Sequence, residues 1–208
     1  MSIRERLLEN PNIFAFFNLL IGVKSRTKVI INEYVSPKSG DVIVDIACGR
    51  GEFSKELAST RYIGVDNNPS YIRYAKKHYS DFGSFHCCDV SDLSTSLNGK
   101  LIDTALLVGV LHHLTNSQAR DMINDIGRHL SDDGKIVSVD PVFTPDQGLI
   151  SRLLAASDRG KYVRSIDEHH SLFDESVEIC QSEIREDWLR IPYTHYVCVS
   201  RKRAKSGI

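Results

Sequence analysis

The sequence predicts an α/β fold: a mostly parallel sheet with helices on both faces. From Val42 onward, short apolar runs that favour strands alternate with segments whose apolar residues recur at helical spacing. This alternation is typical of parallel βαβ units. The run Ile102–Val110 is the most apolar of the chain, as expected for a central strand that is covered on both faces. A length of 208 residues fits one such domain with added segments.

The first half of the sheet is predicted from strands that are each followed by a glycine turn, a helix or a loop. The strand Val42–Ile46 leads through a glycine turn into a helix over Gly51–Ser59. The strand Tyr62–Val65 leads into a helix that Asn68-Pro69 begins, because asparagine caps helices and proline suits their first turn. A short third strand is expected over Ser84–Cys87.

The second half continues the pattern after the central strand. Either Thr115 or Asn116 is expected to cap an amphipathic helix that reaches Leu130. Ser131–Gly134 is predicted as a turn, and Lys135–Val139 as the fifth strand. Two final strands are expected over Val177–Ser182 and Thr194–Ser200.

The chain is predicted to divide into a helical cap or lid over residues 1–38 and a main domain over residues 39–208. The apolar run Ile13–Ile21 is about half as long as a bilayer-spanning helix. It is expected to pack on its own domain, and a membrane or partner contact is the alternative. A second helix is expected over Ser25–Tyr34, and an irregular insertion over about 141–175.

Composition narrows the class of protein. The chain is 41% hydrophobic and 25% charged, with a net charge of −1, which gives no sign of a general nucleic-acid or membrane surface. The N-terminus has no signal-peptide core, and the odd number of cysteines forms no CxxC pair. His169 and His170 are adjacent and so project apart, which is a poor arrangement for a metal. We expect a reduced, cytoplasmic protein with no metal site and no transmembrane segment; the oligomeric state is not readable.

Polar residues gather where the predicted strands end, which is the edge that binds ligands in open α/β sheets. Asp45 closes the first strand just before Gly49 and Gly51, and glycines let a ligand approach the backbone. A dinucleotide site would need a third glycine where Ser54 stands. Asp45 would also repel a pyrophosphate, whereas it suits a cationic or zwitterionic ligand. These residues therefore argue against NAD.

Two further acids suit a nucleoside. Asp66, at the end of the second strand, can accept hydrogen bonds from a ribose diol, and Asp89, after the third strand, can accept one from the exocyclic amine of adenine. Asp45 could instead cap the next helix, and Asp89 alone could be a turn residue. Because these acids occur together at the ends of consecutive strands, ligand binding is the preferred interpretation.

Five segments together resemble the motifs of class I S-adenosylmethionine-dependent methyltransferases. They cover about residues 40 to 140 in the order and spacing of that family, and they are Val44–Gly51, Ile63–Asp66, Cys87–Val90, Leu107–Leu114 and Leu130–Lys135. The resemblance implies a seven-stranded sheet of order 3-2-1-4-5-7-6 with strand seven antiparallel. It also implies S-adenosylmethionine as methyl donor and S-adenosylhomocysteine as product. One departure is Ala47, where the family usually has glycine.

The resemblance also implies roles for single residues in binding the donor. The methionine part would be bound by Asp45, near its amino group, and by Ala47, Gly49, Gly51 and the backbone of Val108. Asp66 would hold the ribose hydroxyls. The adenine side would be formed by Asn67, Cys88, Asp89 and Val90.

Methyl transfer from a sulfonium needs chiefly alignment, and a general base matters only when the acceptor arrives protonated. Histidine suits that role near neutral pH, so His112, His113 and His195 are the candidates. His113 is the one expected to contact the pocket, and its neighbour could be a structural histidine.

Acceptor choice is expected to depend on the cap and on the segments after the fifth strand. Arg159 and Arg164 could clamp a carboxylate or phosphate, with Tyr193 nearby. In the alternative, the two arginines only pair with acids of their own loop.

Three functional readings remain open. The leading one is a methyltransferase for a small molecule, such as a metabolite, sugar or lipid-linked intermediate, which could be anionic. An RNA or protein methyltransferase would need a basic surface, and only Arg201 to Lys205 offers one. The third is a non-catalytic module that binds S-adenosylmethionine.

Overall fold

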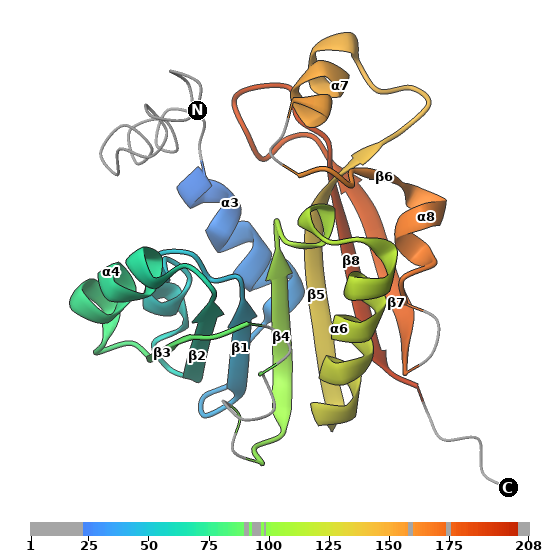
Figure 1. Ribbon diagram of the computed structural model, residues 1–208. Helices are drawn as coiled ribbons and strands as arrows, with labels where there is room; N and C mark the ends of the chain where they lie inside the picture. The colour runs from blue at the N-terminus through green and yellow to red at the C-terminus, as the bar shows by residue number, and fades with distance from the viewer. Residues whose placement is uncertain are drawn as a thin grey trace, which may run out of the picture.

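The protein, seen here as a computed structural model, is described over residues 23–89, 92, 97, 99–157, 160–173 and 176–203. Its centre is a twisted sheet with the strand order β3-β2-β1-β4-β5-β8-β7 (Figure 1). In that order the strands are Ser84–Cys87, Arg61–Asp66, Val42–Ile46, Ile102–Val108, Leu130–Phe143, His195–Lys202 and Val177–Arg185.

Five of these strands, β3 to β5 in the sheet order, pair in parallel, and β8 is antiparallel to both of its neighbours. With β7 and β8 taken as the sixth and seventh strands, the predicted order and the antiparallel seventh strand are confirmed. A short strand, β6 (Arg164–Ser165), also pairs with β5 and was not predicted.

The register brings the predicted ligand-binding segments to one edge. Asp45 lies beside Gly64 of β2 and Leu106 of β4. Because these strands are parallel, the turn after β1, Asp66, and the segment after β4 all follow strand ends at the same side of the sheet. That side is the upper edge in Figure 1.

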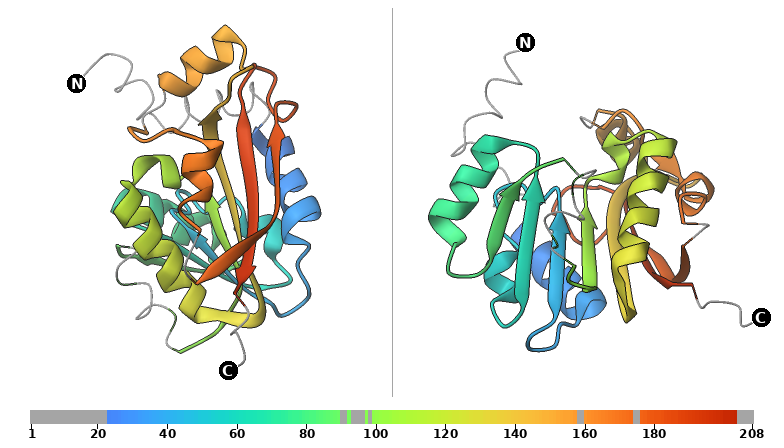
Figure 2. Two further views of the ribbon diagram at one scale, coloured as in Figure 1. Left: turned by 90° about the vertical axis from the view of Figure 1, so that its right-hand side faces the viewer. Right: turned by 60° about the horizontal axis from the view of Figure 1, so that its bottom comes forward.

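Helices cover both faces of the sheet, as predicted. The first face carries α6 (Asn116–His129) and α8 (Ile166–His170), and the other carries α3 (Val23–Val29) with the π-helical turn η1 (Ile30–Val35) (Figure 2). The alternation of side chains along each strand divides the core accordingly. Val44 and Ala105 belong to the cluster that includes α6, and Ile43 and Leu106 to the cluster that includes η1.

Helix ends follow the predicted caps. The side chain of Asn68 accepts hydrogen bonds from the amides of Ser70 and Tyr71, which begins α4 (Pro69–Tyr79). Thr115 begins α6 with a reciprocal capping box to Gln118.

Two elements differ from the prediction. In place of a helix over Gly51–Ser59 there is only a short 3-10 turn, η2 (Ser54–Leu57). The hydroxyl of Ser54 donates to the carbonyl of Gly51 at 2.6 Å, a local bond that competes with α-helical pairing. The predicted turn Ser131–Gly134 lies within the long strand β5, where the register against β4 shifts.

The insertion between β5 and β7 carries α7 (Leu149–Ala156), β6 and α8. In Figure 1, α7 stands above the upper edge of the sheet. Residues 1–22, and with them the predicted helix near Ile13–Ile21, lie outside the described residues, so the cap over residues 1–38 stays a prediction. Among the described residues, no helix is long and apolar enough to cross a membrane.

Candidate active site

The turn after β1 has a backbone path that side chains rarely adopt. Ala47, Gly49 and Gly51 have φ angles of 58°, 56° and 77°. A Cβ on Gly49 would meet open space, whereas a Cβ on Gly51 would lie 2.5 Å from the ring of Phe85. Gly51 is therefore required by packing beneath the turn, while Gly49 faces the ligand side. Ala47 adopts the left-handed conformation despite its methyl group.

Two neighbouring cavities open at this edge of the sheet and share Ala47 and Tyr71. The larger has a volume of about 820 Å³, and the smaller about 230 Å³. Together they fall in the size range of sites for drug-sized molecules. Of the predicted donor contacts, the larger cavity is lined by Ala47, Asp66, Asn67, Cys88 and Asp89, and the smaller by Asp45, Ala47, Gly49 and Val108.

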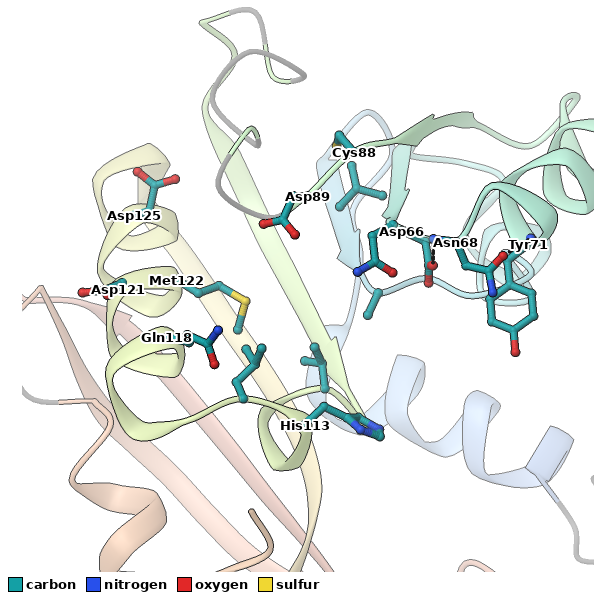
Figure 3. A pocket seen from close by; sticks show the side chains of 15 residues that line it. Asp66, Asn68, Tyr71, Cys88, Asp89, His113, Gln118, Asp121, Met122 and Asp125 are labelled. Atoms are coloured by element: carbon teal, nitrogen blue, oxygen red, sulfur yellow. Dashed lines mark hydrogen bonds between the residues drawn. The ribbon is translucent and has the colours of Figure 1, made fainter. Parts of the chain in front are cut away.

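The larger cavity has a nucleoside-like polar side and a mixed opposite wall. Asp66, Cys88 and Asp89 line one side, and Gln118 and Met122 of α6 line the other (Figure 3). Gly51 lines neither cavity, and Val90 lies outside the described residues.

Asp66 is oriented by two backbone amides. Its Oδ2 accepts from Gly49 N at 2.9 Å, and its Oδ1 accepts from Asn68 N at 2.8 Å. A carboxylate can accept about four hydrogen bonds, so each oxygen keeps capacity for a ligand hydroxyl. The carboxylate is thus fixed at the border of the larger cavity before a ligand arrives.

Asp45 is a buried acid at the smaller cavity, with an exposed fraction of 2%. Burial raises the pKa of Asp45 to about 7, although the hydrogen bond from the Tyr62 hydroxyl lowers it; the charge of Asp66 adds to the increase. A positively charged ligand group beside Asp45 would restore its ionised form.

The histidines after β4 differ in their surroundings. His113 lines the larger cavity and lies near the end of β4 in Figure 3. His112 is buried, and its Nδ1 donates to Oδ1 of Asp140 at 2.6 Å. The backbone of Gly160 lies so close that a Cβ there would overlap the His112 ring. Sequence reasoning missed Asp140, whose signal was an acid at the end of the fifth strand.

His195 and Tyr193 line neither of the two cavities. The His195 ring lies 5.4 Å from that of Trp188 and 5.0 Å from that of Tyr193, and only 3% of the residue is exposed. Burial, followed by the charge of Arg26, lowers the pKa of His195 to about 3. A neutral imidazole of such low basicity is a poor general base at neutral pH.

Arg164 is buried and bonded to the segment after β4. Its guanidinium donates to the carbonyls of Leu111 and Leu114 at 2.7 and 2.6 Å, and to Oδ1 of Asn116 at 2.8 Å. These acceptors give Arg164 a structural role in place of the predicted clamp on an acceptor. They are also not the acids of the alternative interpretation. Arg159 lies outside the described residues.

One cation of the smaller cavity was not predicted. Arg26 of α3 lines this cavity beside the turn after β1. Its Nη1 lies 3.4 Å from Nε2 of His195, and its Nε is buried without a hydrogen-bond partner. A single arginine ahead of the first motif carries no sequence signal of this contact, because α3 reaches the site only through the fold.

Comparison with known proteins agrees with this geometry. Residues 43–134 match a family model described as a methyltransferase domain. That segment runs from β1 into β5 and contains both the turn after β1 and Asp66. Residues 43–134 form a class I methyltransferase domain. S-adenosylmethionine is the methyl donor of such domains, so the two cavities are its candidate site.

Solved methyltransferases share the fold of this domain and its surroundings. The N-methyltransferase NodS from Bradyrhizobium japonicum WM9, in complex with S-adenosylhomocysteine, is 18% identical, with a TM-score of 0.72 over 95% of each chain. Magnesium protoporphyrin IX methyltransferase from Synechocystis PCC 6803 is 17% identical, with a TM-score of 0.66 over 88% of this chain and 84% of its own. At such identities the likeness concerns the fold.

A curated relative is similar over a shorter stretch. The 23S rRNA (uracil(1939)-C(5))-methyltransferase RlmD of Shewanella frigidimarina is 38% identical over 82 residues. This match spans 36% of the present chain and only 18% of the relative.

Proposed function

We propose that this methyltransferase transfers the methyl group of S-adenosylmethionine to a small molecule, such as a metabolite, sugar or lipid-linked intermediate. The observation that carries the proposal is the pair of adjoining cavities, because their combined lining offers separate polar contacts for a nucleoside and for a charged end group. When bound, the donor supplies an electrophilic methyl group on a sulfonium, which an acceptor lone pair displaces in line.

The residues of the site would act mainly by alignment. Asp66 binds the ribose hydroxyls, and Asp45 binds the amino group of the methionine part. Positioning of this kind can contribute about 7–11 kcal/mol to the lowering of the barrier. His113 lines the larger cavity and is the residue best situated to take a proton from an acceptor that arrives protonated.

His112 would support this arrangement without touching the acceptor. Asp140 holds the proton of His112 on Nδ1, and the ring of His112 lies 4.2 Å from that of His113. The pair therefore fixes the loop from which His113 projects.

The charge distribution favours a small acceptor over RNA. Asp121 and Asp125 lie on the α6 side of the larger cavity, where they would repel a phosphate backbone. In the basic tail, Arg201 and Lys202 bond to the carbonyls of Asp133 and Leu130, at the start of β5 and thus far from the site edge. RNA remains the second candidate because of the short similarity to an rRNA methyltransferase.

The proposal extends to organisation and compartment. We propose that residues 1–38 form the cap and residues 141–175 the acceptor side of the site, since α7 lies above this edge (Figure 1). All five cysteines are free thiols, which supports a reducing compartment such as the cytoplasm.

The test is incubation of the purified protein with donor labelled on its methyl group and with fractionated cell extract. We expect label to appear in a low-molecular-weight product, and not with Asp66→Ala. Label confined to RNA or to protein would overturn the small-molecule proposal. Tight binding of S-adenosylhomocysteine without transfer to any fraction would favour a non-catalytic module.

A further inference from the structure

Arg26 is a buried cation without a carboxylate partner. Among the described residues no acid lies within ion-pair distance of its guanidinium, and its polar neighbour is the neutral ring of His195. The buried Nε has no hydrogen-bond partner. Burial lowers the pKa of Arg26, which is the sign of a charge that the protein alone does not compensate. An anion from outside would supply what is missing.

The cavity beside Arg26 shows where that anion would bind. Arg26 lines the same 230 Å³ cavity as Asp45 and Gly49. The other arginine of this cavity, Arg50, is stacked on the ring of Tyr74, with its guanidinium carbon 3.5 Å from the ring centre. Glu52 also lines the cavity and raises the pKa of Arg26 through its charge, but it forms no ion pair with it.

An acid and a base in one small cavity match a zwitterion. Asp45 is suited to an ammonium group, and Arg26 to a carboxylate, for which guanidinium has a matching geometry. The cavity adjoins the larger one through Ala47 and Tyr71, as the amino-acid end of a donor adjoins its nucleoside.

We propose that Arg26 binds the α-carboxylate of the donor's methionine part, opposite Asp45, which binds its ammonium. This inference rests on the proposed use of S-adenosylmethionine. His195 is then a positioning residue: its neutral Nε2 accepts from Arg26 Nη1 and directs the rest of the guanidinium toward the cavity. The donor site therefore includes a residue from α3, ahead of the matched domain.

The test combines a change in the protein with a change in the ligand. Binding of S-adenosylhomocysteine is measured by calorimetry for the wild type, Arg26→Gln and Arg26→Lys, and compared with S-adenosyl-3-thiopropylamine, which lacks only the carboxylate. Arg26→Gln should weaken S-adenosylhomocysteine binding about 10- to 100-fold, as expected for a lost hydrogen bond to a charged group. It should leave binding of the decarboxylated ligand unchanged, and Arg26→Lys should fall between.

Lys28→Gln is the matched control, because Lys28 is exposed on the same helix and lines neither cavity. It should bind both ligands as the wild type does. Equal weakening of both ligands by Arg26→Gln, or no weakening of either, would overturn the inference. If the wild type binds S-adenosylhomocysteine through Arg26 but labels no small molecule, the inference stands and only the acceptor proposal fails. If the wild type binds neither ligand, both fail.

Discussion

The amide of Gly49 donates a hydrogen bond to Oδ2 of Asp66 at 2.9 Å, which ties the turn after β1 to the end of β2. The contact joins the two predicted motifs directly, although they are separate in the sequence. Asp66 thus has two tasks: it shapes the glycine turn and presents its remaining lone pairs to the larger cavity.

Asp66→Asn should therefore disturb both tasks. An amide group has one oxygen, so it cannot accept from both Gly49 N and Asn68 N without turning an NH₂ toward one of these donors. We expect affinity for S-adenosylhomocysteine to fall at least about tenfold, measured by calorimetry. Asp81→Asn, a change of an exposed acid, is the control. Unchanged affinity in Asp66→Asn would show that the ribose is held elsewhere.

Donor binding should depend on pH through Asp45. The pKa of Asp45 is raised to about 7, so the acid becomes protonated as the pH falls below that value and loses its attraction for an ammonium group. Affinity for S-adenosylhomocysteine should be highest above pH 7 and should decrease up to about tenfold per pH unit below it. Titrations between pH 8 and 6 would measure this, and Asp45→Asn should give a weak, flat profile. A wild-type profile that rises toward acid would contradict the assignment.

Arg164→Lys should lower stability and not donor affinity. Lysine cannot reach the carbonyls of Leu111 and Leu114 and the side chain of Asn116 together, so buried acceptors lose their partner. Each such loss costs about 1–3 kcal/mol. Urea unfolding is the measurement, and Lys161→Ala, an exposed change nearby, is the control. A raised acceptor KM with unchanged stability would instead support the clamp predicted from the sequence.

Acid should destabilise the fold through buried histidines. Burial lowers the pKa of His169 to about 4, while the unfolded value is about 6.5. Between these values the unfolded chain binds a proton that the folded chain does not, so the free energy of unfolding falls as the pH falls through this window. The slope is about 1.4 kcal/mol per pH unit for each such group.

Unfolding of His169→Gln at pH 7.5 and 5.0 would test this. The variant should lose about 2 kcal/mol less than the wild type on acidification. His78→Gln, which changes an exposed histidine, should behave as the wild type. An equal loss in all three proteins would mean that other groups govern acid unfolding.

The sequence predicted best what depends on short segments. The strand β1, the turn after it and the cap at Asn68 are local patterns, and the strand order followed from the resemblance of five such segments. Ala47 was expected in the turn, but its left-handed conformation was visible only in the structure.

Contacts between distant elements could not be predicted. The bond of Asp140 to His112, and the burial of Arg164 beneath Leu114, arise from β5, β6 and the segment after β4 meeting at one edge. A charged residue in a loop, such as Arg164, looks solvated in a sequence because burial is a property of the whole fold. The same holds for Arg26, which lies outside every recognised motif.

The contact between Arg26 and His195 joins residues that are 169 positions apart. Two neighbouring contacts of the same kind, Tyr34 to Glu183 and Glu33 to Arg185, span 149 and 152 positions. During synthesis on the ribosome, the early helix must therefore wait for the last hairpin before it can settle on the sheet. A nascent chain stalled before residue 195 would carry every methyltransferase motif and still lack a completed binding site.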